Sequence, residues 1–163
     1  MAYGKVLAVL TGDTADQGVL AQGADMVRPV KGRLFAVYVI QVDRALPVDA
    51  EVGPATAMGE EILAQAEVSV RLPRGDFEAQ LLQARELGPA VVQEARRWEV
   101  DAVVVGATSR TEFGRLALGD DVPYVLEHAP CLVVLWREAP PRRSQRNGRP
   151  AGTRVANGVV ARV

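Results

Sequence analysis

The sequence is poor in the residues from which catalytic and metal centres are usually built. It has one histidine and one cysteine among 163 residues, and aromatic residues make up 5%. The single cysteine, Cys131, excludes a disulfide within the chain and is typical of a reducing compartment. The first apolar run, from Val6 to Leu10, is too short for a signal-peptide core, and no stretch approaches the ~20 apolar residues of a membrane helix. We therefore expect a cytoplasmic protein without a membrane span.

Further absences narrow the chemistry. The sequence contains no zinc-ligand spacing, no Walker-type GK[ST] motif and no GxSxG nucleophile elbow. His128 falls at the end of an expected helix, where the helix dipole favours it, and Cys131 lacks a CxxC partner, which indicates a buried structural thiol. Asp13 and Asp16 fall at an expected helix start, where capping explains them better than a catalytic carboxylate pair does. We predict a protein that is not an enzyme and binds no metal.

What the chain does contain is an uneven distribution of charge. The 19 basic and 20 acidic residues give a net charge of −1, but residues 141–163 hold six arginines and no acid. Residues 1–140 therefore carry 13 basic against 20 acidic residues, a net charge of −7. From residue 140 the composition turns to Arg, Pro, Gly, Ser and Asn, which bury little apolar surface. We predict a folded domain over residues 1–139 and a basic tail over residues 140–163.

Three hypotheses remain open for this tail. Its arginines, without interleaved aromatic residues, are suited to sequence-independent contact with the phosphates of nucleic acid, or to an acidic partner. Alternatively the tail docks on the domain or on a partner through Val155, Val159 and Val160, which flank an Asn157-Gly158 hairpin signal. The third hypothesis is a solvated extension.

Runs of β-branched and aromatic residues alternate with helical patterns along residues 1–139. The expected strands cover residues 6–10, 33–40, 77–83, 100–105 and 131–136. The expected helices cover residues 13–26, 59–71, 88–98 and 123–128, and residues 41–56 are expected to form a long loop. Residues 59–71 also alternate like a strand; we assign a helix because parallel strands need a helical crossover.

Five strands alternating with four helices predict an α/β fold: a five-stranded, parallel, doubly wound, Rossmann-like sheet with strand order 3-2-1-4-5 and helices on both faces. Ligands of such sheets bind at the carboxyl ends of the strands, where the strand order reverses. This edge brings together Thr11, Gly12, Val39 and the loop that follows Gly106. A glycine-punctuated loop that leads from a strand into a helix is suited to anions, because free N–H groups and the helix dipole point there.

Several segments carry a resemblance to a known family. They read KVLAVLTGD, LGPAVVQEA, DAVVVGA and LGDDVPYVLEHAPCLVVLW, and lie within residues 4–138. In these segments the chain resembles the universal stress proteins (UspA-like), a family of ATP binders and non-binders that usually form homodimers. The resemblance implies a stress-response or regulatory protein.

The resemblance also identifies candidate site residues. ATP-binding members carry Gly, two residues, Gly, nine residues, Gly and then Ser or Thr. This chain keeps the spacing as Gly106, Ser109, Gly119 and Asp120, so that two of the four positions differ. Thr11 stands where the family has an aspartate that contacts adenine, and Val39 stands where a backbone contact to adenine is expected.

Asp120 changes the chemistry expected of this loop. A carboxylate about 4 Å from a phosphate repels it by ~4 kcal/mol per charge pair at an effective dielectric near 20, and Asp121 adds a second acid. Either aspartate can also cap the following helix and occupy its N–H groups. Arg110 and Arg115 oppose this effect, because arginine binds phosphate strongly. We predict a degenerate nucleotide site; the alternative is an ATP or AMP sensor, with slow hydrolysis left open, that uses the loop from Gly106 to Asp121.

The strand from Cys131 to Trp136 is expected at an edge of the sheet. An uninterrupted apolar edge strand has to be covered to avoid uncontrolled pairing. We therefore predict a homodimer through this strand. Which stress, ligand or partner the protein responds to is not encoded in any motif of the chain.

Overall fold

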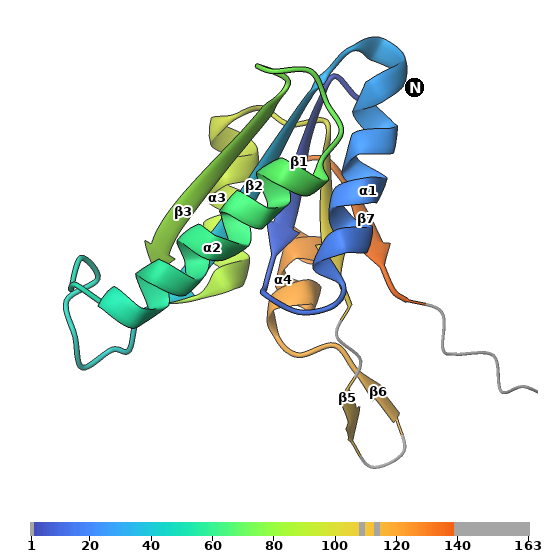
Figure 1. Cartoon of the computed structure of the whole chain (residues 1–163). Helices are drawn as coiled ribbons and strands as arrows, with labels where there is room; N and C mark the ends of the chain where they lie inside the picture. The colour runs from blue at the N-terminus through green and yellow to red at the C-terminus, as the bar shows by residue number, and fades with distance from the viewer. Residues whose placement is uncertain (1, 108–109, 113–114, 139–163) are drawn as a thin grey trace, which may run out of the picture.

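The computed structural model describes residues 2–107, 110–112 and 115–138. Ser109 and the basic tail, with every hypothesis about that tail, lie outside the described residues. The strands are β1 (Lys5–Leu10), β2 (Arg33–Gln41), β3 (Phe77–Ala84), β4 (Ala102–Gly106), β5 (Arg110–Glu112), β6 (Arg115–Ala117) and β7 (Leu132–Trp136). The helices are α1 (Asp16–Val27), η1 (Arg28–Val30), α2 (Gly53–Ser69), α3 (Leu87–Arg97) and α4 (Asp121–His128), with η1 a 3-10 turn (Figure 1).

The main sheet has the predicted topology. Its strands are all parallel and lie in the order β3-β2-β1-β4-β7, which is 3-2-1-4-5 in chain order. Strand β1 pairs with β2 on one side, Ala8 opposite Ala36, and with β4 on the other, Ala8 opposite Val104. The strand order therefore reverses between β1 and β4, and the carboxyl ends of these two strands frame the expected crevice.

Side chains of β1 alternate between two apolar layers. Leu7 and Val9 belong to the core beneath α3 and α4, whereas Val6 and Ala8 belong to the core beneath α1 and α2. This alternation follows from the two-residue repeat of a strand, and burial on both faces explains the nearly continuous apolar run. Figure 1 shows the resulting three layers, with helices on both faces of the sheet.

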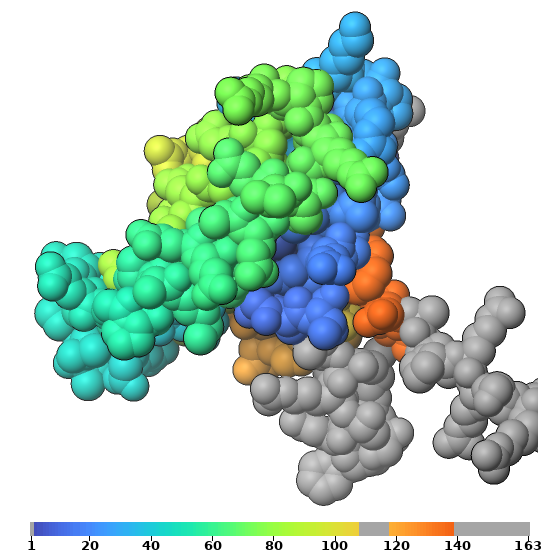
Figure 2. Space-filling model, viewed as in Figure 1, coloured from blue at the N-terminus to red at the C-terminus, as the bar shows by residue number. Residues whose placement is uncertain are grey.

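Two segments differ from the sequence-based expectation. Helix α2 begins at Gly53, six residues before the expected start at Gly59, so that the loop covers residues 42–52 only. Pro54 stands in the first turn of this helix, where the missing N–H of proline costs nothing. The loop 42–52 projects beyond α2 at the carboxyl end of the sheet (Figures 1 and 2). The second difference is a short antiparallel hairpin, β5 with β6, within what was expected to be a continuous loop.

The strand β7 is an edge of the sheet and is anchored to α1. The ring of Trp136 occupies the space next to Gly18, where an added Cβ would stand 2.0 Å from the ring carbon Cζ2. Leu132 and Leu135 of the same strand remain 45% and 39% exposed. No helix of the described residues is long and apolar enough to cross a membrane.

Candidate functional site

The loop that connects β1 to α1 is held by one carboxylate. Asp16, the first residue of α1, accepts the N–H of Thr11 at 2.9 Å with Oδ1 and the N–H of Gly12 at 2.8 Å with Oδ2. Gly12 has φ +83°, a left-handed conformation that turns its amide toward Asp16. Both backbone donors at the carboxyl end of β1 are therefore occupied from within the chain.

Burial raises the pKa of the Asp16 carboxyl above its ordinary value. The loss of solvation outweighs the two amide hydrogen bonds, which lower the pKa, and the nearby charge of Asp13 raises it further. Capping was expected of both aspartates. The Oδ1 of Asp13 accepts the N–H of Ala15, which precedes α1, at 2.8 Å and so closes a turn ahead of the helix, and Asp16 bonds backward to the loop rather than to its own helix. Neither bond caps α1.

An open hollow lies beside this loop, at the carboxyl ends of β1 and β2. Its volume is about 410 Å³. It is lined by Leu10, Thr11, Tyr38, Val39, Ile40, Gln41, Ala55 and Leu87. The structure therefore brings Thr11 and Val39 together, as the resemblance implied, and adds Tyr38 and Leu87, which no motif indicated.

A second, smaller hollow lies at the ends of β1 and β4, against α3 and α4. It has a volume of about 30 Å³, and its lining includes Thr11, Leu87, Gly106 and Asp121. Thr11 and Leu87 line both hollows and so stand between them.

Gly106 has a packing role that needs no ligand. An added Cβ at this position would lie 3.0 Å from the Cβ of Ala15 and 3.4 Å from a methyl carbon of Val19. The glycine therefore lets the start of α1 approach the end of β4. Gly119, in contrast, has open space around it and φ +68°, so a left-handed backbone is the requirement there.

The two acids of the loop act differently from each other. Asp121 does not cap α4; its Oδ1 accepts the N–H of Gly88 in the first turn of α3 at 2.9 Å and ties the two helices together. Asp120 holds the N-cap position of α4, is exposed and makes no side-chain capping bond. The expectation that an aspartate side chain caps α4 is therefore wrong, because Asp121 accepts from the neighbouring helix instead and Asp120 makes no capping bond.

The remaining candidates of the loop are placed only in part. Arg110 begins β5 and Arg115 begins β6, but their side chains lie outside the described part of the structure, as does Ser109 altogether. Residues 2–107, 110–112 and 115–138 contain no group of three or more histidine, cysteine, aspartate or glutamate side chains placed to hold a metal ion.

The two residues with reactive side chains are engaged structurally. His128 is the last residue of α4; its Nδ1 lies 2.9 Å from the carbonyl oxygen of Tyr124, and its ring stacks on the Tyr124 ring at 4.1 Å. Cys131 is half-buried and directly precedes β7. Burial, followed by the charge of Asp101, raises the pKa of the Cys131 thiol, which makes the thiolate less available at neutral pH.

Comparisons with known proteins agree with this architecture. Among solved structures, a universal stress protein from Archaeoglobus fulgidus in complex with dAMP is 18% identical, with a TM-score of 0.64 over 83% of this chain and 98% of that one. The universal stress protein UspA from Lactobacillus plantarum is 21% identical, with a TM-score of 0.60 over 84% and 99%. An Arabidopsis thaliana family protein with AMP bound is 17% identical, with a TM-score of 0.56 over 83% and 92%.

At these identities the structural likeness establishes the fold alone. No match was found among curated protein sequences. The model of the universal stress protein family, however, matches residues 2–137, which is nearly the whole described chain. The chain therefore belongs to the universal stress protein family.

Proposed function

We propose that this chain is a non-enzymatic regulatory protein of the stress response, cytoplasmic and homodimeric, with a degenerate nucleotide site. The observation that carries the proposal is the engagement of Asp16 with the amides of Thr11 and Gly12. A nucleotide that used these donors would have to displace a carboxylate already in place. Asp120 and Asp121 add negative charge at the start of α4, where a phosphate would otherwise be attracted by the helix dipole.

Two other residues support the non-enzymatic part of the proposal. The imidazole of His128 contacts Tyr124, and the raised pKa of Cys131 disfavours a thiolate nucleophile. We expect no release of phosphate from ATP above that of a buffer control. Release of one or more phosphates per chain, if it persists after further purification, would contradict the non-enzymatic proposal.

A second candidate function is the sensing of an adenine nucleotide. The open hollow beside Thr11 and Val39 favours it, since its volume of about 410 Å³ lies in the range of small-molecule sites. Solved relatives include a complex with cAMP and complexes with AMP and dAMP. In this alternative the base occupies the hollow while the phosphates have few partners.

Calorimetry with ATP, AMP and cAMP separates the two candidates. For the degenerate site we expect no saturable heat with the natural chain, and weak binding that appears or strengthens about tenfold in Asp120→Ser, because one charge repulsion is removed. Glu138→Gln, which removes an exposed acid beyond β7, is the matched control. Tight binding by the natural chain would establish the sensor and overturn the degenerate site.

The proposed homodimer forms through β7. This strand pairs with β4 along one edge, and in the described residues no strand pairs with its other edge. Leu135 of this strand is 39% exposed, and an exposed apolar side chain on an edge strand favours an interface that covers the edge. Sedimentation should show a dimer for the natural chain and a monomer for Leu135→Lys. Leu126→Lys, at a 50% exposed position of α4, should remain dimeric; a monomeric natural chain would contradict the proposal.

A further inference from the structure

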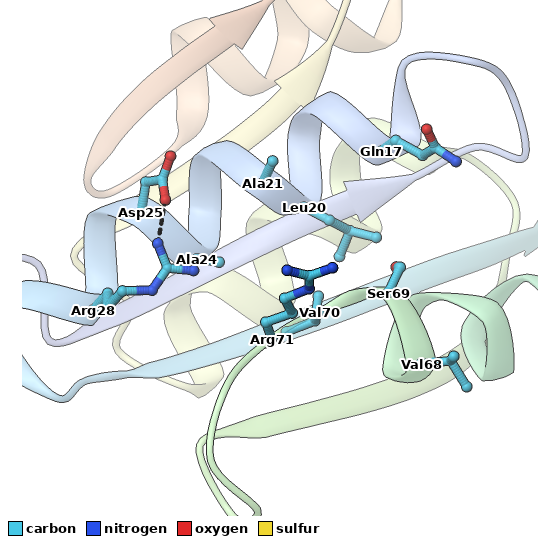
Figure 3. Close-up of a pocket in the computed structure, with 10 residues that line it drawn as sticks. All are labelled: Gln17, Leu20, Ala21, Ala24, Asp25, Arg28, Val68, Ser69, Val70 and Arg71. Atoms are coloured by element: carbon cyan, nitrogen blue, oxygen red, sulfur yellow. Dashed lines mark hydrogen bonds and ion pairs between the residues drawn. The ribbon is translucent and has the colours of Figure 1, made fainter.

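A groove separates α1 from α2 on the face of the sheet that both helices cover. Its volume is about 500 Å³, and none of its lining residues belongs to the nucleotide site. The residues contributed by α1 recur at helical spacing and so form one face of that helix. The lining residues, drawn in Figure 3, are Gln17, Leu20, Ala21, Ala24, Asp25, Arg28, Val68, Ser69, Val70 and Arg71.

The groove stays open because the side chains of α1 that face α2 are small. Ala21 and Ala24 stand where larger residues would close the gap between the helices. Leu20 and Ala24 are only 5% and 3% exposed and, with half-buried Val70, form an apolar floor. An apolar chain laid on this floor would gain the transfer free energy of each methylene removed from water.

Arg71, an arginine above this floor, has no ion-pair partner among the described residues. Arg71 is exposed and follows Val70, the C-cap residue of α2, and Figure 3 shows its guanidinium between the two helices, near Leu20 and Ser69. Within the described residues, no hydrogen bond or ion pair engages that guanidinium. The acid that shares the groove, Asp25, is already paired with Arg28.

The polar neighbours of Arg71 restrict the ligand further. The hydroxyl of Ser69 donates to the carbonyl oxygen of Ala66 at 3.0 Å and so cannot also donate to a ligand. Arg71 offers an anionic head group a charged donor that is not paired with an acid, and its planar guanidinium matches a carboxylate in a two-bonded arrangement. Beyond Gln17 and Leu20 the groove continues into a second hollow, about 270 Å³ in volume, where Asp13 and Asp16 would repel an anion.

From this arrangement we propose that the groove binds a medium-chain monocarboxylate, with the carboxylate on Arg71 and the alkyl chain over Leu20 and Ala24. The face from Gln17 on α1 to Arg28 at the start of η1 spans about 16 Å at 1.5 Å per residue, a length suited to an extended alkyl chain. This site goes beyond the proposed function and does not depend on it.

Titration of the isotopically labelled full chain with decanoate, below the concentration of micelle formation, tests the proposal by amide chemical shifts. We expect saturable shifts at Leu20, Ala21, Ala24 and Val70. Arg71→Gln should weaken binding at least about fivefold, because a charge-assisted hydrogen bond is lost. Arg74→Gln, an exposed arginine outside the groove, should leave the affinity unchanged.

Two further probes separate head group from chain. Decanol, which has the chain without the charge, and acetate, which has the charge without the chain, should each bind much more weakly than decanoate. Ala21→Phe, a substitution at an exposed position that narrows the groove, should abolish decanoate binding while the spectrum of the fold is retained. Shifts scattered over the whole surface, equal affinity for decanol, or full affinity in Arg71→Gln would each overturn the proposal.

Discussion

The bond between Asp16 and the loop at the end of β1 can be tested by Asp16→Asn. The natural carboxylate accepts two amides, at 2.9 and 2.8 Å, whereas asparagine offers one acceptor oxygen and turns an NH₂ group toward the other amide. The amide left facing the NH₂ group without an acceptor costs ~1–3 kcal/mol, and relief from burying the charge, which the raised pKa of Asp16 shows to be unfavourable, offsets part of that loss. We expect a net destabilisation of about 1 kcal/mol at pH 7.

Urea denaturation measures this change. With a denaturant slope of ~2 kcal/mol per M, the unfolding midpoint should fall by about 0.5 M. Glu61→Gln, which neutralises an exposed acid on α2, should leave the midpoint unchanged. An Asp16→Asn midpoint equal to that of the natural chain would mean that the carboxylate does not hold the loop.

The pH dependence gives an independent check of the same carboxylate. Because burial raises the Asp16 pKa above its ordinary value of 3.8, the folded chain binds this proton more readily than the unfolded chain. The stability contributed by protonation is therefore full below pH 3.8 and is lost as the pH rises through the higher folded pKa. The difference between the urea midpoints of the natural chain and Asp16→Asn should grow as the pH falls toward 3.8. A difference that shrinks instead would refute burial as the cause of the raised pKa.

Two other perturbations have sharp expectations. In thermal melts, Gly32→Ala should lower the free energy of unfolding by about 2 kcal/mol or more, because its Cβ would lie 2.4 Å from the backbone oxygen of Gly4. Gly53→Ala, with open space around it, should be neutral or slightly stabilising in the same measurement. Cys131 should react with a disulfide reagent at pH 7 more slowly than free cysteine, and should approach its rate in urea, because burial raises the thiol pKa.

Much of the fold could be predicted because buried parallel strands leave a strong pattern. The run from Val6 to Leu10 is apolar on both faces, and five strands separated by helices permit few topologies. The start of α2 was missed because Pro54 and Gly59 resemble breakers. In the structure Pro54 stands in the first helical turn, and Gly59 lets α2 approach β3, where an added Cβ would lie 2.5 Å from Leu81.

The hydrogen-bond partners within the site could not be predicted in the same way. Sequence position places Asp16 and Asp121 at helix starts, which is typical of capping. The acceptor of each amide, however, depends on which loop passes nearby: Gly12 turns back toward Asp16, and Gly88 comes from a helix 33 residues away in sequence from Asp121. Such partners are decided by tertiary packing, for which the chain carries no local signal.

Helix α1 borders three surfaces at once. Its first residue, Asp16, holds the loop of the candidate nucleotide site; Gly18 lies beneath Trp136 of the edge strand; and Ala21 and Ala24 face the groove. A ligand or a second subunit that orders any of these surfaces slows the opening of the same helical hydrogen bonds. Amide exchange along α1 is therefore a common reporter for events at the edge strand β7, in the crevice and in the groove, which site-specific substitutions can then tell apart.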